Sequence, residues 1–190
     1  MRARMALKLA CIEVEIREIS LREKPTHMLQ VSPKGTVPVL VLADGQVIEQ
    51  SLEIMQWALN EHALQNNIHE VAGTSVLGIV TENDNVFKRA LDAYKYPERY
   101  PSKTQIQHRA DGEVFLKKLE NLLLENNYLF STMPSFADIA IFPFVRQFTA
   151  VDAVWFDGVD YPKLRVWLNT MADSALFASI MEKYPTYQAM

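Results

Sequence analysis

Two groups of residues that could hold a small peptide lie close together in the stretch from Ser32 to Ser51. Val37 stands before Pro38 at the start of an apolar run, where a proline can open a strand and an X-Pro bond can be cis. The backbone of Val37 could then pair with an extended peptide, as an added strand would. Ser51 begins an expected helix, whose free N-terminal amides suit a carboxylate. The spacing predicts a recognition site for a small acidic peptide.

The residues around this stretch alternate between helix and strand patterns. Residues 1–10 are rich in helix formers, and residues 11–19 alternate apolar and charged, as in a strand with one buried face. The expected order is a helix at 1–10, a strand at 11–19, a loop with a short helix at 21–30, two strands around the turn Asp44-Gly45, and a helix at 51–62 whose inner face carries Leu52, Met55, Ala58 and Leu59.

Beyond a polar stretch at 64–73, which we interpret as a linker, every segment has a helical pattern. Ser135 and Asp138 form a capping box at the start of an almost wholly apolar helix, which we expect at the centre of this part. The sequence thus predicts an α+β protein with domains at 1–63 and 74–190. The helix-spaced apolar positions of the second domain are Val76, Val80, Phe87, Leu91, Tyr94, Phe115, Leu116, Leu119, Leu122 and Leu123.

Composition excludes several classes of function. The chain has 190 residues, 49% of them apolar and 22% charged, and a net charge of −4 without a basic run, so we expect no nucleic-acid partner. We see no long apolar segment or signal peptide, which predicts a cytoplasmic protein that does not enter a membrane. A single cysteine excludes an internal disulfide, and the four scattered histidines predict no metal site.

Three motifs carry a resemblance to a known family: Ser32-Pro-Lys-Gly-Thr-Val-Pro-Val-Leu, Val47-Ile-Glu-Gln-Ser and Pro134-Ser-Phe-Ala-Asp-Ile-Ala-Ile-Phe. In order and spacing they resemble the cytosolic glutathione transferases, above all the omega-like and bacterial cysteine-type members and the larger glutaredoxins with a helical domain. The resemblance covers essentially the whole chain. It implies a thioredoxin-like N-terminal domain, an all-helical C-terminal bundle, glutathione as ligand and a homodimer.

The resemblance also implies roles for individual residues. Val37 would pair with the cysteinyl part of glutathione, and Pro38 would be a cis-proline. Gln50 and Ser51 would hold the γ-glutamyl end, and Lys24 would reach the glycyl carboxylate. Each has a simpler interpretation: Pro38 could only open a strand, Ser51 could only cap a helix, and Lys24 could be a solvated charge.

The chain departs from the family pattern at its start. The first strand and the catalytic Cys, Ser or Tyr of the family are expected before Met1, so we expect a truncated N-terminal domain. Because that strand is central, either residues 13–19 pair with 37–42 or another segment fills the gap. Cys11 lies near the far end of the first helix, where the dipole disfavours a thiolate, and we interpret it as a small buried residue.

Two hypotheses about function follow. The intact protein conjugates glutathione to an electrophile or exchanges thiols and disulfides with it, or the chain is a catalytically inactive binding or interaction module. The sequence leaves open whether this chain is itself an enzyme. Phe87, Tyr94, Tyr96 and Trp155 could line a pocket for a second substrate, although aromatics at helical spacing more often belong to a core.

Overall fold

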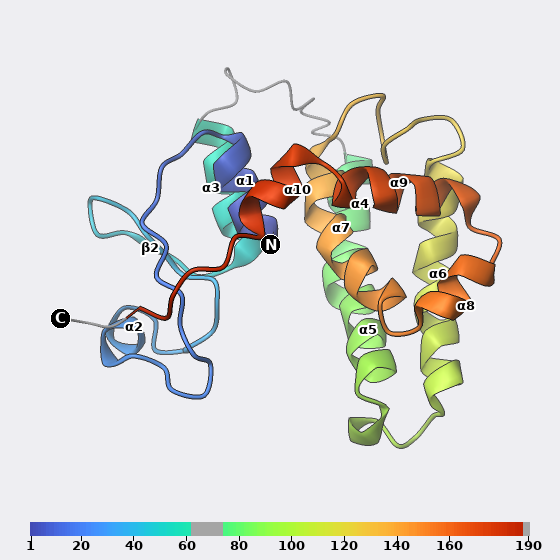
Figure 1. Ribbon diagram of the computed structural model, residues 1–190, viewed down its shortest axis with the longest axis horizontal. Coiled ribbons are helices and arrows are strands. Elements are labelled where there is room, and N and C mark those ends of the chain that lie inside the picture. The colour runs from blue at the N-terminus through green and yellow to red at the C-terminus, as the bar shows by residue number, and fades with distance from the viewer. Residues whose placement is uncertain (62–73, 188–190) are drawn as a thin grey trace. The chain divides into compact units, whose positions relative to one another are not determined.

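The computed structural model describes residues 1–61 and 74–187, which divide into two compact units (Figure 1). Residues 1–61 and 175–187 form an α+β unit, and residues 74–174 form an all-helical unit. The expected linker at 64–73 falls outside the described residues. Residues 175–187, which the sequence placed in the helical domain, group with the first unit instead.

The first unit is built on a helix pair. α1 packs against α3, and α10 packs on α1. Met5 and Ala6 on α1 are fully buried. On the predicted inner face of α3, Met55 and Ala58 are fully buried, whereas Leu52 and Leu59 are only partly buried. The elements of this unit are α1 (Arg2–Leu9), α2 (Thr26–Val31), β1 (Leu40–Val41), β2 (Val47–Ile48), α3 (Ser51–Glu61) and α10 (Ala175–Ile180).

A short hairpin confirms the predicted turn at Asp44-Gly45. β1 and β2 pair antiparallel, with Leu40 opposite Ile48. Gly45 has a φ of +88°, which glycine adopts without steric cost. The side chain of Asp44 accepts a hydrogen bond from the backbone N–H of Gln46 at 2.9 Å. Turn chemistry close in sequence therefore sets the register of this hairpin.

The predicted strand at 11–19 does not form. Within residues 1–61 and 74–187, its one bridge is a parallel pairing of Glu18 with Thr186, and Val14 is 39% exposed. Residues 1–61 build a sheet of two strands, β1 and β2. The alternating pattern was misleading because a strand also needs a neighbour to receive its backbone hydrogen bonds. Here the neighbour comes from the far end of the sequence.

Cys11 is exposed, so its predicted burial is wrong. It follows Ala10, the C-cap of α1, and adopts the left-handed region with a φ of +53°. The N–H of Ile12 donates to the carbonyl of Leu7 at 3.0 Å, and the N–H of Cys11 donates to the carbonyl of Lys8 at 3.1 Å. These two bonds form a Schellman motif, in which the position of Cys11 is usually glycine. The chain reverses at this residue, and its side chain stays on the surface.

Replacement of Cys11 by glycine should stabilise the protein. The left-handed conformation strains any residue with a Cβ, so Cys11→Gly should raise the free energy of unfolding by about 1 kcal/mol in urea denaturation. Cys11→Ser keeps the strain and serves as the control, with an expected change within about 0.5 kcal/mol. Equal stability of the two variants would contradict this account.

The second unit is a helical bundle whose first helix contains a π turn. α4, η1 and α5 run on as one helix, beside α6 (Figure 1). Nearly all of the predicted core positions are buried; Leu122 is only partly so. The elements are α4 (Thr74–Glu82), η1 (Asn83–Phe87), α5 (Lys88–Lys95), η2 (Pro97–Arg99), α6 (Gln105–Leu122), α7 (Phe136–Thr149), α8 (Ala153–Gly158) and α9 (Pro162–Ala172).

The centre of this bundle is organised by Asp138 on α7, which confirms the predicted capping box with Ser135. The fully buried carboxylate accepts from the N–H and the hydroxyl of Ser135, at 2.8 and 2.5 Å. It also accepts from the N–H of Leu129 at 3.0 Å and from the indole N–H of Trp167 at 2.7 Å. Burial raises the pKa of Asp138, and the hydrogen bonds act in the opposite direction. One carboxylate thus connects α7, the loop before it and α9.

Replacement of one carboxylate oxygen of Asp138 should strongly destabilise the fold. Asp138→Asn turns an NH₂ group toward buried donors, and we expect a loss of about 2–4 kcal/mol in the free energy of unfolding. Asp173→Asn changes an exposed carboxylate at the end of α9 and should cost less than about 0.5 kcal/mol. Urea denaturation of both variants measures the difference, and similar losses would contradict a structural role for Asp138.

Candidate functional site

The loop that leads to Val37 is held by a glycine in the left-handed region. It begins at Ser32, where α2 ends, and the N–H of Gly35 donates to the carbonyl of Ser32 at 2.9 Å. Gly35 has a φ of +59°. A Cβ built there would lie 3.1 Å from Leu29 Cδ2. The turn and the close packing on α2 therefore both require glycine here.

Val37 presents an open backbone. Its peptide bond to Pro38 is cis, as the resemblance implied. The residue is 49% exposed, and neither its N–H nor its carbonyl is hydrogen-bonded within the part of the chain that the structure describes. β1 begins only at Leu40. The two backbone groups of Val37 are therefore available to an extended peptide.

Lys24 lies against the same loop. Its Nζ is 3.3 Å from the position that a Cβ on Gly35 would occupy. The side chain is otherwise exposed. The structure thus brings a cation to the turn that leads to Val37, although Lys24 comes well before it in the sequence.

Gln50 and Ser51 stand at the N-terminus of α3. The carbonyl of Gln50 accepts the first helical hydrogen bond, from the N–H of Ile54 at 2.9 Å. The amides of Ser51, Leu52 and Glu53 have no hydrogen-bond partner among the described residues. Such amides, at the positive end of the helix dipole, attract a carboxylate.

Glu49 is a site residue that the sequence did not point to. Its carboxylate accepts from the hydroxyl of Ser32 at 2.6 Å and from Nζ of Lys34 at 3.0 Å. Ser32 is fully buried. These hydrogen bonds, that of Ser32 first, hold the pKa of Glu49 below its usual value. One carboxylate therefore ties the loop before Val37 to the segment before Ser51. No local pattern could reveal a pair so far apart in sequence.

The four aromatic residues predicted to line a second-substrate pocket all belong to the helical unit. Phe87 and Tyr94 are 1% and 2% exposed, and both rings pack on Phe148, with centroids 5.2 and 4.8 Å apart. The ring of Trp155 also contacts that of Phe148, with centroids 6.2 Å apart. Tyr96 is half-buried and belongs to none of these three ring contacts. Phe87 and Tyr94 serve as core residues here, and the pocket stays a prediction.

The residues of this site offer unpaired backbone groups and a cation to a ligand. Cys11 is the only cysteine of the chain, and it lies at the C-terminal end of α1. Across residues 1–61 and 74–187, no three His, Cys, Asp or Glu side chains gather in a way that could hold a metal ion. No helix in those ranges is long and apolar enough to cross a membrane.

Comparison with known proteins decides the family. Residues 1–62 match the family model for the N-terminal domain of glutathione S-transferases, and residues 108–170 match the model for their C-terminal domain. The chain belongs to the glutathione S-transferase family. Its fold is accordingly a reduced thioredoxin-like N-terminal domain with a small sheet, followed by the helical C-terminal domain of the family.

Solved glutathione S-transferase structures share this fold. A glutathione S-transferase from Rhodospirillum rubrum is 21% identical, with a TM-score of 0.75; the match covers 97% of this chain and 88% of that one. Glutathione transferase F7 from Populus trichocarpa is 17% identical, with a TM-score of 0.76 and coverage of 94% and 91%. A homologue from Sulfitobacter, solved with bound glutathione, is 18% identical, with a TM-score of 0.73 and coverage of 94% and 90%.

The hydrogen bonds of Glu49 should make stability depend on pH. A carboxylate whose pKa is lowered in the folded state stabilises it above the unfolded pKa, about 4.3, and loses this effect as the pH falls through the folded pKa. Glu49→Gln should therefore lower the melting temperature at pH 7, and the difference from the unmodified protein should vanish in acid.

Glu23→Gln, at an exposed position in the same unit, is the matched control and should melt like the unmodified protein at every pH. Differential scanning fluorimetry between about pH 3 and pH 8 measures both variants. A melting-temperature difference for Glu49→Gln that stays constant over this range would contradict the proposed stabilisation by the Glu49 hydrogen bonds.

Proposed function

We propose that this protein binds glutathione in its N-terminal domain. The observation that carries the proposal is the unpaired backbone of Val37 beside cis Pro38, in the same unit as the free amides at the start of α3. Glutathione offers matching groups, because it is a peptide with a carboxylate at each end. The solved structure of the Sulfitobacter homologue, which contains glutathione, supports the same ligand.

Each end of glutathione has a partner in this proposal. The cysteinyl backbone pairs with Val37, as a short added strand would. The γ-glutamyl carboxylate binds the α3 amides beside Gln50 and Ser51. The glycyl carboxylate reaches Lys24, whose ammonium lies against the Gly35 turn. This use of Lys24 is the feature that favours an omega-like or bacterial cysteine-type member.

The chemical activity that we propose is glutathione conjugation or thiol–disulfide exchange with glutathione. Both need a thiol or hydroxyl beside the sulfur of glutathione, to activate it or to exchange with it. We expect such a protein to act in the cytoplasm as a homodimer, with a small electrophile or disulfide as the second substrate.

The alternative is a catalytically inactive glutathione-binding or interaction module. The position of Cys11 favours it, since the only thiol of the chain lies at the opposite end of α1 from the one where this chemistry is expected. The two hypotheses share the glutathione site and differ in turnover alone.

Glutathione binding should depend on Ser51. Ser51→Ala removes a hydroxyl at the start of α3, and we expect about tenfold weaker binding in isothermal titration calorimetry. Ser179→Ala, on an exposed part of α10, is the matched control and should bind glutathione as the unmodified protein does. Absence of any thermal stabilisation by millimolar glutathione would overturn the proposed site.

Turnover separates the two hypotheses. Conjugation of an aromatic electrophile or reduction of a small disulfide at the expense of glutathione would support the enzyme, and the same activity in Cys11→Ser would exclude Cys11 as the nucleophile. Glutathione binding without either activity would support the module.

A further inference from the structure

The C-terminal segment behaves like a bound peptide in the first unit. α10 ends at Ile180, and residues 181–187 continue without a helix. This segment runs beside the residues that follow α1 (Figure 1). Thr186 forms the parallel bridge with Glu18, and the N–H of Tyr187 donates to the carbonyl of Glu18 at 2.7 Å. The contact thus resembles the pairing of an added β-strand, although it is limited to one bridge.

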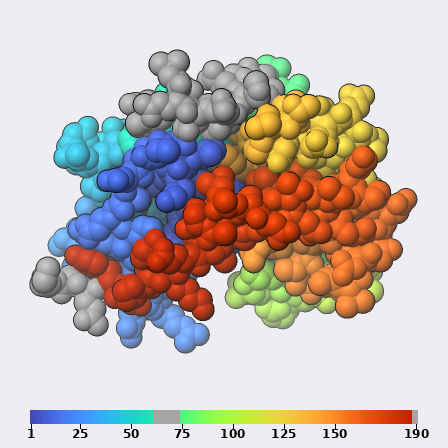
Figure 2. Space-filling model, turned by 45° about the horizontal axis from the view of Figure 1, so that its top comes forward, coloured from blue at the N-terminus to red at the C-terminus, as the bar shows by residue number. Residues whose placement is uncertain are grey.

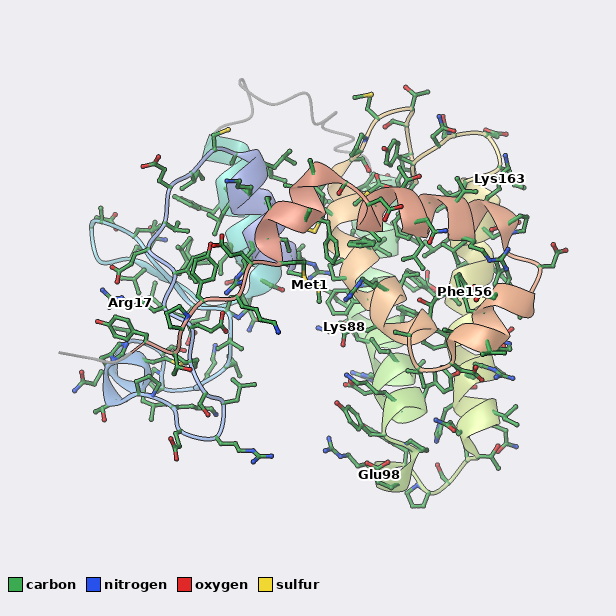
Figure 3. All side chains as sticks on the ribbon, viewed as in Figure 1. Met1, Arg17, Lys88, Glu98, Phe156 and Lys163 are labelled. Atoms are coloured by element: carbon green, nitrogen blue, oxygen red, sulfur yellow. The ribbon has the colours of Figure 1, made fainter. Side chains whose placement is uncertain are left out.

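Two tyrosines anchor this segment on two arginines. The ring of Tyr187 lies under the guanidinium of Arg17, 4.7 Å from its centroid, and Figure 3 shows Arg17 beside the segment. The same ring meets the edge of His27 on α2, with centroids 5.3 Å apart. The ring of Tyr184 lies 5.6 Å from the guanidinium of Arg4 on α1. Cations over aromatic faces attract the rings at both positions.

The spacing of the tyrosines suits this arrangement. Residues three apart in an extended chain point to opposite sides, so Tyr184 and Tyr187 can reach arginines from two different elements. Pro185 keeps Tyr184 in an extended conformation and fixes its own φ. A Tyr-Pro-Thr-Tyr segment is therefore partly ordered as a strand before it binds.

The residues that contact this segment also interact with one another. Arg4 forms an ion pair with Glu18 at 2.5 Å, and the carbonyl of Glu18 is the acceptor for Tyr187. An exposed extended segment with unpaired backbone groups invites such pairing. Figure 2 shows the segment, in dark red, at the surface against the blue N-terminal residues.

We propose that the edge at Glu18, with Arg4, Arg17 and His27, is a binding surface for an extended Tyr-Pro-Thr-Tyr peptide. Its occupant is this chain's own segment 184–187, which closes the surface as an intramolecular strand. The proposal is independent of glutathione binding. Because α10 holds the segment close by, its effective concentration is in the millimolar range, and a free peptide competes poorly with it.

A peptide titration tests the surface. The full chain with Tyr184→Ala and Tyr187→Ala should release its own segment and bind a fluorescent peptide of residues 182–187, measured by anisotropy. The unmodified protein should bind this peptide at least about tenfold more weakly, since its own segment occupies the surface. A peptide with both tyrosines replaced by alanine, and the double variant with Arg17→Ala added, should each lose binding.

A second measurement uses the unmodified protein and so does not depend on the folding of a variant. In hydrogen exchange followed by NMR, the amide of Tyr187 should exchange at least tenfold more slowly than that of Lys183, which makes no hydrogen bond in the described residues. Equal exchange of the two amides, or equal peptide binding by the unmodified and double-variant proteins, would overturn the proposal. Protection of Tyr187 that disappears on dilution would place the segment on a second copy and overturn the intramolecular assignment.

Discussion

Backbone groups in the small α+β unit need hydrogen-bond partners, and this requirement explains two features of the unit, at Glu18 and at Val37. At Glu18 the carbonyl is satisfied by Tyr187, from the far end of the sequence. At Val37 the N–H and carbonyl find no partner among the described residues. The first case joins two extended segments by one bridge, and the second leaves open the place where a peptide ligand can pair. The same physical rule thus produces a structural contact and a candidate binding site.

The candidate site is held in shape by interactions of its loop rather than by a large sheet. Gly35 turns the chain in the left-handed region, and Glu49 joins the buried Ser32 to the segment before α3. These contacts fix Val37 relative to the first amides of α3 while β1 and β2 span only two residues each. A reduced thioredoxin-like domain can therefore keep a defined binding geometry. Its stability depends correspondingly more on a few side chains.

The helical domain follows a different principle. Its centre contains a buried carboxylate, and Asp138 is acceptable there because four donors surround it. The aromatic rings of Phe87 and Tyr94 pack beside Phe148 and exclude water from the core. The sequence could predict this domain well, because helical spacing marks the buried positions and a capping box depends on residues three apart.

By itself the sequence determined the features that depend on near neighbours: the hairpin at Asp44-Gly45, most buried positions of the second unit's helices and the capping box of Asp138. It also placed Val37 and Ser51 in one short stretch, through motifs typical of the family. Only the tertiary structure decided that residues 11–19 form no strand, that Cys11 is exposed and that Glu49 accepts a hydrogen bond from Ser32. Each of these depends on a partner distant in sequence or on the path of the chain after a helix. A pattern shows which face of a segment prefers burial, but the hydrogen-bond partner of its backbone is chosen by the whole fold.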